Sequence, residues 1–428
     1  MHLPELSEMN VERRYDWLAA GLLIALFVFS WKATRFYGVD TPLFLALGIF
    51  CLWRLGQSPV AITKPALKAY LLWAGWVVFS DFYSAQFAPA FARDSHWLLL
   101  PLFALLCAAI LRDVPALISL LRLTAAASVI TIALHLIIAA PDVSNWIREP
   151  VFGHVRYLSM AVGALVIWLY DDEQLGKVAR IVVSVARFTG LVILCWAGGR
   201  GVLLALAAAI LVQITLFANA RRRALVFVLE GILAAGVSEL ISVGHSPMGL
   251  ANSPMGLVNS LSRSVTAETA DGLSSARLTL WSSTLKRLGD GMGLWFGWGG
   301  NGFIRMGLAR GFIFHPHNVV LQILTDWGAV GLLLFANFLR VAIRPLTGLN
   351  LSTSNAALAI SIIAYSLITG MIDGGLYHPQ FLICVGIAFA ILLAQLGKTD
   401  VKPSTLVISP VPMILVILVM LVTHLRMF

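Results

Sequence analysis

Charged residues are scarce in this chain. Asp, Glu, Lys and Arg together make up 12% of the 428 residues, about half the share found in soluble globular proteins. Hydrophobic residues make up 59%, and the mean hydropathy is +0.88. So few polar side chains cannot cover the surface of a soluble protein of this size. The composition therefore excludes a soluble globular protein and indicates a membrane protein.

Cysteine is also sparse. The four cysteines lie inside apolar segments, at Cys51, Cys107, Cys195 and Cys384. Neither their spacing nor their setting fits a disulfide framework or a metal site, so small buried side chains are expected. The net charge of +9 is scattered without aromatic residues interleaved on a polar face, which excludes nucleic acid as a partner. The first sixteen residues are polar and of mixed charge, so no cleavable signal peptide is expected.

Apolar runs of spanning or near-spanning length fill most of the chain. Thirteen occur, at 17–34, 40–56, 66–83, 96–112, 115–140, 156–170, 179–197, 200–219, 223–243, 318–341, 353–371, 379–397 and 406–425. They predict an all-α polytopic membrane protein with 12 or 13 transmembrane helices, because some shorter runs could be half-helices. A transmembrane β-barrel would instead show alternating segments of about ten residues.

Basic residues set the orientation of these runs. If the runs alternate across the membrane, the basic clusters share one side: Arg13, Arg14, Arg54, Lys64, Lys68, Arg112, Arg122, Lys177, Arg180, Arg221, Arg222, Arg223, Arg340, Arg344, Lys398 and Lys402. That side is cytoplasmic by the positive-inside rule. Three polar features then share the opposite side: the break at 198–200, the segment 245–317 and the turn 373–378. This shared location predicts that they form one site.

The segment 245–317 is the one extended polar stretch of the sequence. It separates N-terminal transmembrane helices (1–244) from C-terminal transmembrane helices (318–428) and predicts a large extracytoplasmic domain with amphipathic helices. It opens with a tandem seven-residue repeat, 246–252 and 253–259, to which we assign no chemistry. A helix capped by Ser274 and running to about Arg287 is expected at the membrane surface. Its apolar stripe is Leu278, Trp281, Leu285 and Leu288.

Two arginines are candidates for anion binding. Arg200 opens a helix, where a cation is unfavourable unless an anion also binds there. The alternatives for Arg200 are snorkelling to the headgroups or pairing with an internal carboxylate. Arg277 lies one turn before Trp281, whose indole could hold the guanidinium in place. Its alternative is a solvated interfacial arginine. The remaining basic residues of this segment are expected to be surface charges: Arg263, Lys286, Arg287 and Arg305.

The stretch His315-Pro316-His317-Asn318, just before the run 318–341, holds the strongest candidates for chemistry. A helix N-terminus favours a neutral imidazole, which can act as a general base. Asn318 could instead cap the helix, and each histidine could simply bind a carbonyl. A zinc site is a further alternative, although a third ligand is not evident. Asp373, in the turn 373–378, could orient an imidazole, pair with an arginine, or serve as a turn residue.

A family resemblance rests on the same stretch. His317-Asn318, nine residues, Gly328, two residues and Gly331 resemble the signature of the O-antigen ligase and polymerase superfamily. The layout is similar to its O-antigen ligase (WaaL) branch: many spans, an arginine opening a middle helix, and a large loop with a second arginine. The chain departs from that pattern before Arg200, where Ala197-Gly198-Gly199 replace a Ser-x-Ser-Arg type sequence.

The resemblance implies a glycosyltransferase at the periplasmic face of a Gram-negative inner membrane. The donor would be O-antigen on undecaprenyl diphosphate and the acceptor lipid A–core oligosaccharide, with no metal and no cofactor. Arg200 and Arg277 would hold the diphosphate, and His317 would take the acceptor proton in an inverting transfer. The other substrate-binding or orienting residues would be His315, Asn318, Trp281 and Asp373.

Other functions remain open at this point. An O-antigen polymerase would use a second lipid-linked glycan as acceptor, and a protein O-oligosaccharyltransferase would use hydroxyl side chains of secreted proteins. The glycine-spaced histidine motif favours the ligase or the oligosaccharyltransferase. A lipid-linked sugar transporter would show charges near the midplane or inverted repeats, and neither is evident. The sugar specificity, the glycan length and the oligomeric state are not predicted.

Overall fold

A computed structural model describes residues 11–30, 63–84, 86–139, 155–170, 175–217, 220–245, 269, 276–289, 291–309, 313–348 and 353–396. The predicted runs 40–56 and 406–425, the tandem repeat, Cys51, Arg263 and Ser274 lie outside these residues. The described residues form helices joined by turns and contain no extended strand. The all-α fold class is therefore confirmed.

The eleven other predicted runs all coincide with helices. These are α1 (Val11–Ser30), α3 (Lys64–Tyr83), α4 (Phe87–Asp113), α5 (Leu117–Ala139), α6 (Val155–Trp168), α7 (Lys177–Ala197), α8 (Arg200–Leu216), α9 (Ala220–His245), α15 (Val319–Ile343), α16 (Ser354–Ile372) and α17 (Pro379–Leu396). The largest difference is at α4, which begins nine residues before the predicted run 96–112. Arg93 and Asp94 interrupt the apolar pattern there, but both have partners in the folded protein.

The chain is a multi-pass membrane protein. Six of the described helices are long and apolar enough to cross a membrane: Phe87–Asp113, Leu117–Ile138, Lys177–Ala197, Arg221–Ile241, Val319–Leu346 and Ser354–Ile372. Four further apolar helices are shorter: Asp16–Val28, Val155–Trp168, Arg200–Leu216 and Gln380–Leu396. α3 is in neither group. The predicted total of 12 spans is therefore not confirmed.

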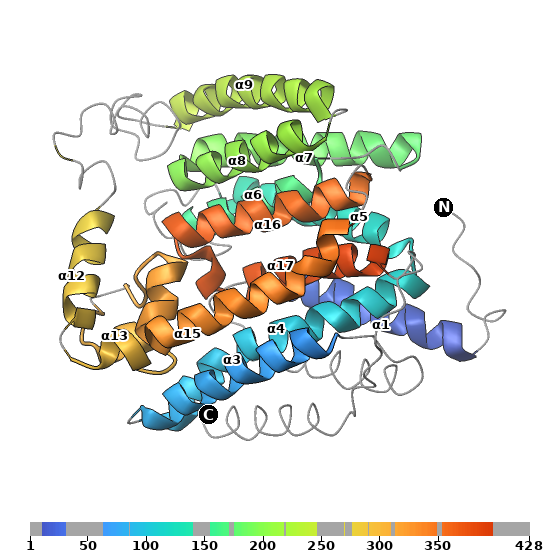
Figure 1. The fold of residues 1–428 in the computed structure, drawn as a ribbon. Coiled ribbons are helices and arrows are strands. Elements are labelled where there is room, and N and C mark those ends of the chain that lie inside the picture. Colours follow the sequence, from blue (N-terminus) through green and yellow to red (C-terminus); the bar gives the residue numbers. More distant parts are fainter. Residues whose placement is uncertain are drawn as a thin grey trace.

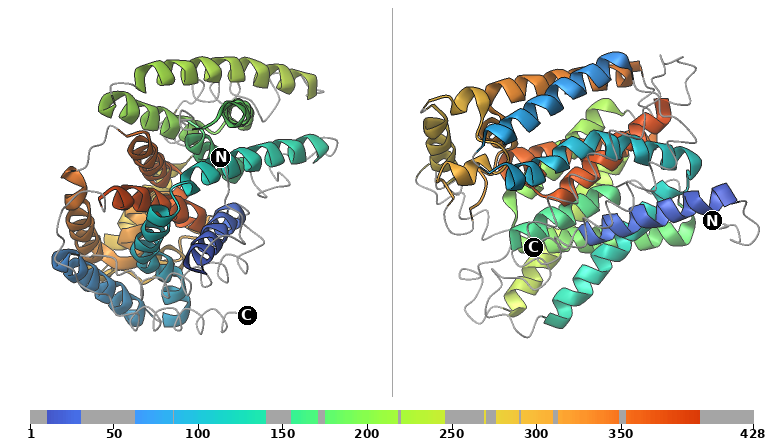
Figure 2. Two further views of the ribbon diagram at one scale, coloured as in Figure 1. Left: turned by 90° about the vertical axis from the view of Figure 1, so that its right-hand side faces the viewer. Right: turned by 90° about the horizontal axis from the view of Figure 1, so that it is seen from below.

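The long helices run side by side, and the helices of the segment 245–317 cross one end of this bundle (Figure 1). Those helices are α12 (Arg277–Gly289), α13 (Gly293–Phe296) and α14 (Gly302–Arg305), and all three pack against α15. α15 also packs along α3, α16 along α8, and α17 along α4. α9 lies at an outer edge of the bundle beside α7 and α8 (Figures 1 and 2). The proposed domain division at 244 and 317 stays a prediction.

The predicted apolar stripe of α12 is divided between two environments. Leu288 is fully buried, whereas Leu278 and Leu285 are 42% and 52% exposed. The helix therefore packs against α15 with its last turn and leaves part of the stripe uncovered. Its expected position at the membrane surface stays a prediction.

α15 is kinked at Gly328, the first glycine of the histidine motif. Gly328 has φ +68°, in the left-handed region, and a Cβ atom there would overlap the backbone of Trp295 and Gly297. The carbonyls just before the kink, whose helical partners lie beyond it, accept hydrogen bonds from elsewhere. Thr325 accepts from the Trp298 amide (2.8 Å), and Trp327 from the Trp76 indole (2.9 Å). The left-handed glycine at position 328 thus lets the loop after α13 pack against the kink in α15.

Three buried aspartate side chains help to hold the loop between α13 and α14 in place. They are Asp81 of α3, Asp94 of α4 and Asp326 of α15. Asp81 accepts from the Gly300 amide and Asp326 from the Gly302 amide, both at 2.8 Å, while Asp94 accepts from the Trp327 indole at 2.6 Å. These hydrogen bonds fix the segment that precedes the histidines.

Arg305 was predicted to be a surface charge, and this is wrong. Its guanidinium donates to the Trp298 carbonyl at 2.8 Å and to the Gln86 carbonyl at 3.1 Å. Gln86 lies between α3 and α4, 219 positions from Arg305, so no local sequence pattern predicts this contact. Arg305 therefore helps to hold the loop that Asp81 and Asp326 fasten.

Gly328→Ala is expected to destabilise the protein by at least about 2 kcal/mol, because it combines a left-handed backbone with steric overlap. Thermal unfolding of the purified protein in detergent measures the effect. Gly231→Ala is the matched control: Gly231 lies in α9 with no atom near its missing Cβ, so alanine should stabilise the helix by about 0.5–1 kcal/mol. Equal thermal stability of the two variants would contradict this account of the motif.

Candidate active site

Several helices begin around one turn, formed by residues 373–378. Asp373 ends α16, and α17 begins directly after His378. The start of α8 lies against this turn, since a Cβ on Gly201 would touch the Asp373 carboxylate. The start of α6 is also adjacent, with the Tyr157 and His378 rings 4.9 Å apart. Because helix N-termini carry partial positive charge and free amides, this arrangement favours an anion.

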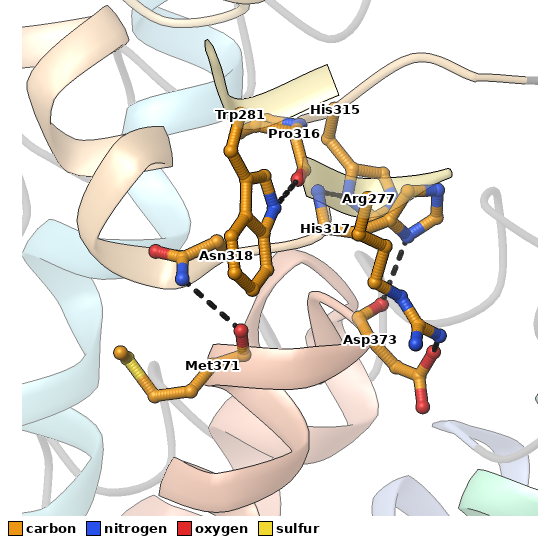
Figure 3. Close-up of polar contacts among 8 residues, drawn as sticks. All are labelled: Arg277, Trp281, His315, Pro316, His317, Asn318, Met371 and Asp373. Carbon is orange, nitrogen blue, oxygen red and sulfur yellow. Dashed lines mark hydrogen bonds and ion pairs between the residues drawn. The ribbon is translucent and has the colours of Figure 1, made fainter. Parts of the chain in front are cut away.

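Arg277 is the first residue of α12 and is held over this turn. Its guanidinium forms an ion pair with the Asp373 carboxylate, and the two side chains are only 16% and 11% exposed (Figure 3). The bond uses one of the five N–H donors of the arginine. The ion pair thus fixes the guanidinium beside the turn 373–378.

His317 lies beside the same aspartate. Its Nδ1 is 3.2 Å from the Asp373 carbonyl oxygen (Figure 3). A carbonyl can only accept, so Nδ1 carries the proton and Nε2 is the basic nitrogen. Burial lowers the pKa of His317 from its usual 6.5, as do Arg156 and Arg277, whereas the Asp373 carbonyl and carboxylate raise it. The net lowering leaves His317 neutral and able to accept a proton at neutral pH.

The backbone at His317 is unusual for a residue with a side chain. Its φ of +54° lies in the left-handed region, which is costly outside glycine. Two contacts hold it: the His317 amide donates to Nδ1 of His315 (3.2 Å), and the Trp281 indole donates to the Pro316 carbonyl (2.9 Å). Figure 3 shows the two rings and the indole around this turn. The conformation is therefore held by its surroundings.

Asn318 has a capping role. Its Oδ1 accepts from the amides of Val320 and Leu321, both at 3.0 Å, at the start of α15. Its Nδ2 donates to the Met371 carbonyl of α16 at 3.1 Å. The side chain is 8% exposed. Asn318 thus joins the motif to α16, and its predicted role in substrate binding stays a prediction.

Arg200 lies at the first position of α8, next to Gly201 and hence near Asp373. It is partly exposed. The structure thereby brings together the three polar features that the sequence placed on one side of the membrane: the break before α8, the segment before α15 and the turn 373–378. Their assigned roles toward a substrate remain predictions.

Sequence reasoning missed two neighbours of this site. Arg156 is the second residue of α6 and lowers the pKa of His317 through its charge. Arg93 of α4 binds the carbonyl of Tyr377 and stacks on its ring, 3.7 Å from the centroid. A charged residue next to an apolar run was the available signal for both arginines. Nothing in the sequence shows that they face one turn.

A metal ligand set was one alternative for the histidines. Within the described ranges, no group of three or more His, Cys, Asp or Glu side chains is arranged to hold a metal ion. His315 and His317 instead lie beside each other, with Tyr377 and His378 next to His315 and the Asp373 carbonyl next to His317.

Comparison with known proteins covers the same region. Residues 185–336 match a family described as O-antigen ligase. No curated protein matches the chain significantly. The matched region is about a third of the chain and holds every predicted site residue except Asp373. Residues 185–336 are thus similar to the O-antigen ligase superfamily, whose members are membrane glycosyltransferase-like ligases and polymerases.

Proposed function

We propose that the chain is an O-antigen ligase of the inner membrane of a Gram-negative bacterium. It would transfer O-antigen from undecaprenyl diphosphate to lipid A–core oligosaccharide at the periplasmic face. The observation that carries this proposal is the meeting of Arg277 and His317 on Asp373 among helix N-termini. One aspartate thereby fixes both an anion-binding group and a base.

The donor diphosphate is the anion that this arrangement suits. A diphosphate leaving group gains negative charge as the anomeric C–O bond breaks. Guanidinium groups aimed at those oxygens stabilise that charge most in the transition state. Arg277 is fixed by its ion pair with Asp373, and Arg200, which precedes Gly201 at the start of α8, is the candidate for a second guanidinium. The two arginines would thus do the work that a divalent cation does in other glycosyltransferases.

His317 would supply the base. The acceptor hydroxyl gives its proton to Nε2 of His317 while its oxygen attacks the anomeric carbon. The bond between that carbon and the diphosphate breaks, and undecaprenyl diphosphate leaves with the electron pair. Because attack and departure are in line on opposite faces, the anomeric configuration inverts. Asp373 would keep the imidazole in the reactive tautomer through its carbonyl.

Reconstitution with defined substrates tests the proposal. Purified protein, lipid-linked O-antigen and lipid A–core in detergent, with a chelator and without an ion gradient, are expected to give glycosylated lipid A–core. The product is measured by gel shift and mass spectrometry. A requirement for added metal would contradict the role of the arginines. Failure with this acceptor, but elongation of lipid-linked glycan, would identify a polymerase.

Two other outcomes separate the remaining alternatives. Transfer to a serine- or threonine-containing protein acceptor, but not to lipid A–core, would identify a protein O-oligosaccharyltransferase. Movement of lipid-linked glycan across a vesicle membrane without any transfer would identify a transporter. The match to a superfamily of glycosyltransferase-like enzymes favours transfer.

A further inference from the structure

A chain of ring contacts leads from α4 to the predicted base. The Arg93 guanidinium lies 3.7 Å from the centroid of the Tyr377 ring and also donates to the Tyr377 carbonyl. His315 also stacks on Tyr377, with the ring centroids 4.3 Å apart and an interplanar angle of 19°. His315 in turn accepts the His317 amide proton at Nδ1.

We propose that Arg93 is a positioning residue that acts on His317 through Tyr377 and His315. The inference rests on the proposed function, because it assigns His317 the role of base. Arg93 supplies two separable things. Its planar guanidinium fixes the place of Tyr377, and its charge faces the buried His315 ring.

The geometric part follows from the contacts. Tyr377 belongs to η4 (Gly375–Tyr377), the 3₁₀ turn that connects Asp373 to α17. Its hydroxyl also contacts Oδ1 of Asn301 at 3.2 Å, so the ring is held from both ends. A ring fixed in this way gives His315 one flat surface to stack on. His315 then presents Nδ1 to the left-handed backbone of His317.

The electrostatic part follows from the hydrogen-bond role of His315. Its Nδ1 can accept the His317 amide proton only while it is unprotonated. The pKa of His315 lies well below its usual 6.5, because of burial first and then the electrostatic effects of His317, His378 and Arg93. Tyr377 is the further titratable group stacked on it. Arg93 thus helps to keep the His315 ring neutral and accepting.

Two substitutions separate charge from shape. Arg93→Gln removes the charge, so His315 becomes more basic and protonates at a higher pH, breaking its bond to His317. The pH below which kcat of glycan transfer falls should therefore rise. Arg93→Lys keeps the charge but loses the planar guanidinium that lies on the Tyr377 ring and donates to its carbonyl. It should lower kcat by about 10- to 100-fold with that pH unchanged.

The experiment measures kcat and KM of glycan transfer between pH 5 and 8 for both variants and the wild type. Arg112→Gln, an exposed arginine at the other end of α4, is the matched control and should leave the profile unchanged. A wild-type profile and wild-type kcat in both Arg93 variants would overturn the proposal.

A second readout is independent of activity. Histidine ring ¹³C signals of the purified protein, assigned with His315→Asn, report the titration of His315 directly. We expect the pKa of His315 to rise in Arg93→Gln and to stay in place in Arg93→Lys. An unchanged titration in Arg93→Gln would overturn the role of Arg93 even if glycan transfer is never observed. Should Arg93→Gln fail to fold, the kcat of Arg93→Lys decides.

Discussion

His317→Ala is expected to abolish O-antigen transfer to lipid A–core while lipid-linked O-antigen accumulates. A positioned general base contributes about 10²- to 10⁴-fold to a rate, and the imidazole of His317 is held against the Asp373 carbonyl. His315 is the nearest other histidine, at 4.2 Å between ring centroids, but its Nδ1 is engaged by the His317 amide. Lipopolysaccharide gels of a complemented ligase-deficient strain, and the rate with purified substrates, measure the loss.

The control for this variant is another histidine. His135 lies on α5, is exposed, and should tolerate alanine without loss of transfer. Equal amounts of both variants in the membrane fraction exclude a folding defect. Normal capped lipopolysaccharide from the His317→Ala strain would end the assignment of His317 as base, although the match of residues 185–336 to the family would stand.

Arg277→Lys is the second large effect. We expect transfer to fall by about 10²- to 10³-fold, the usual cost of removing one preorganised contact to a charged transition state. Lysine keeps the charge, but it is a point donor that cannot bind Asp373 and a phosphate oxygen with the planar geometry of a guanidinium. The loss should appear in kcat more than in KM, because the charge on the diphosphate grows in the transition state.

Arg287→Lys provides the comparison for this substitution. Arg287 is an exposed arginine in the last turn of the same helix, so the exchange tests the chemistry at a position away from Asp373. Purified variants are compared at saturating donor and acceptor. A kcat for Arg277→Lys within a factor of two of wild type would count against diphosphate binding at Arg277.

The sequence by itself determined the class of structure. Apolar runs of spanning length can be stable only as helices in a bilayer, because every backbone polar group must be bonded within the segment. The eleven runs that fall on described residues are helices for this reason. The motif around His317 was also visible, since its histidine and its glycines lie within one short segment. The distribution of basic residues put Arg200, Arg277, His317 and Asp373 on the same side of the membrane, which predicted that they form one site.

The exact contacts depended on the tertiary structure. Arg277 and Asp373 are 96 positions apart, and the Asp81, Asp94 and Asp326 side chains come from three helices. Isolated charges at the ends of apolar runs look alike in a sequence, whether they face lipid headgroups or each other. Arg93 is such a case, because its partner Tyr377 is 284 positions away.

Local chemistry therefore decided which segments form apolar helices and where the histidine of the motif lies. Only helix packing decided which carbonyl fixes the tautomer of that histidine, which aspartate holds Arg277, and why Gly328 must be glycine. The physical reason is the range of the interactions. Hydrophobic burial and helix formation act within a segment of about 20 residues, whereas the hydrogen bonds of the site join helices whose neighbours are set by the whole bundle.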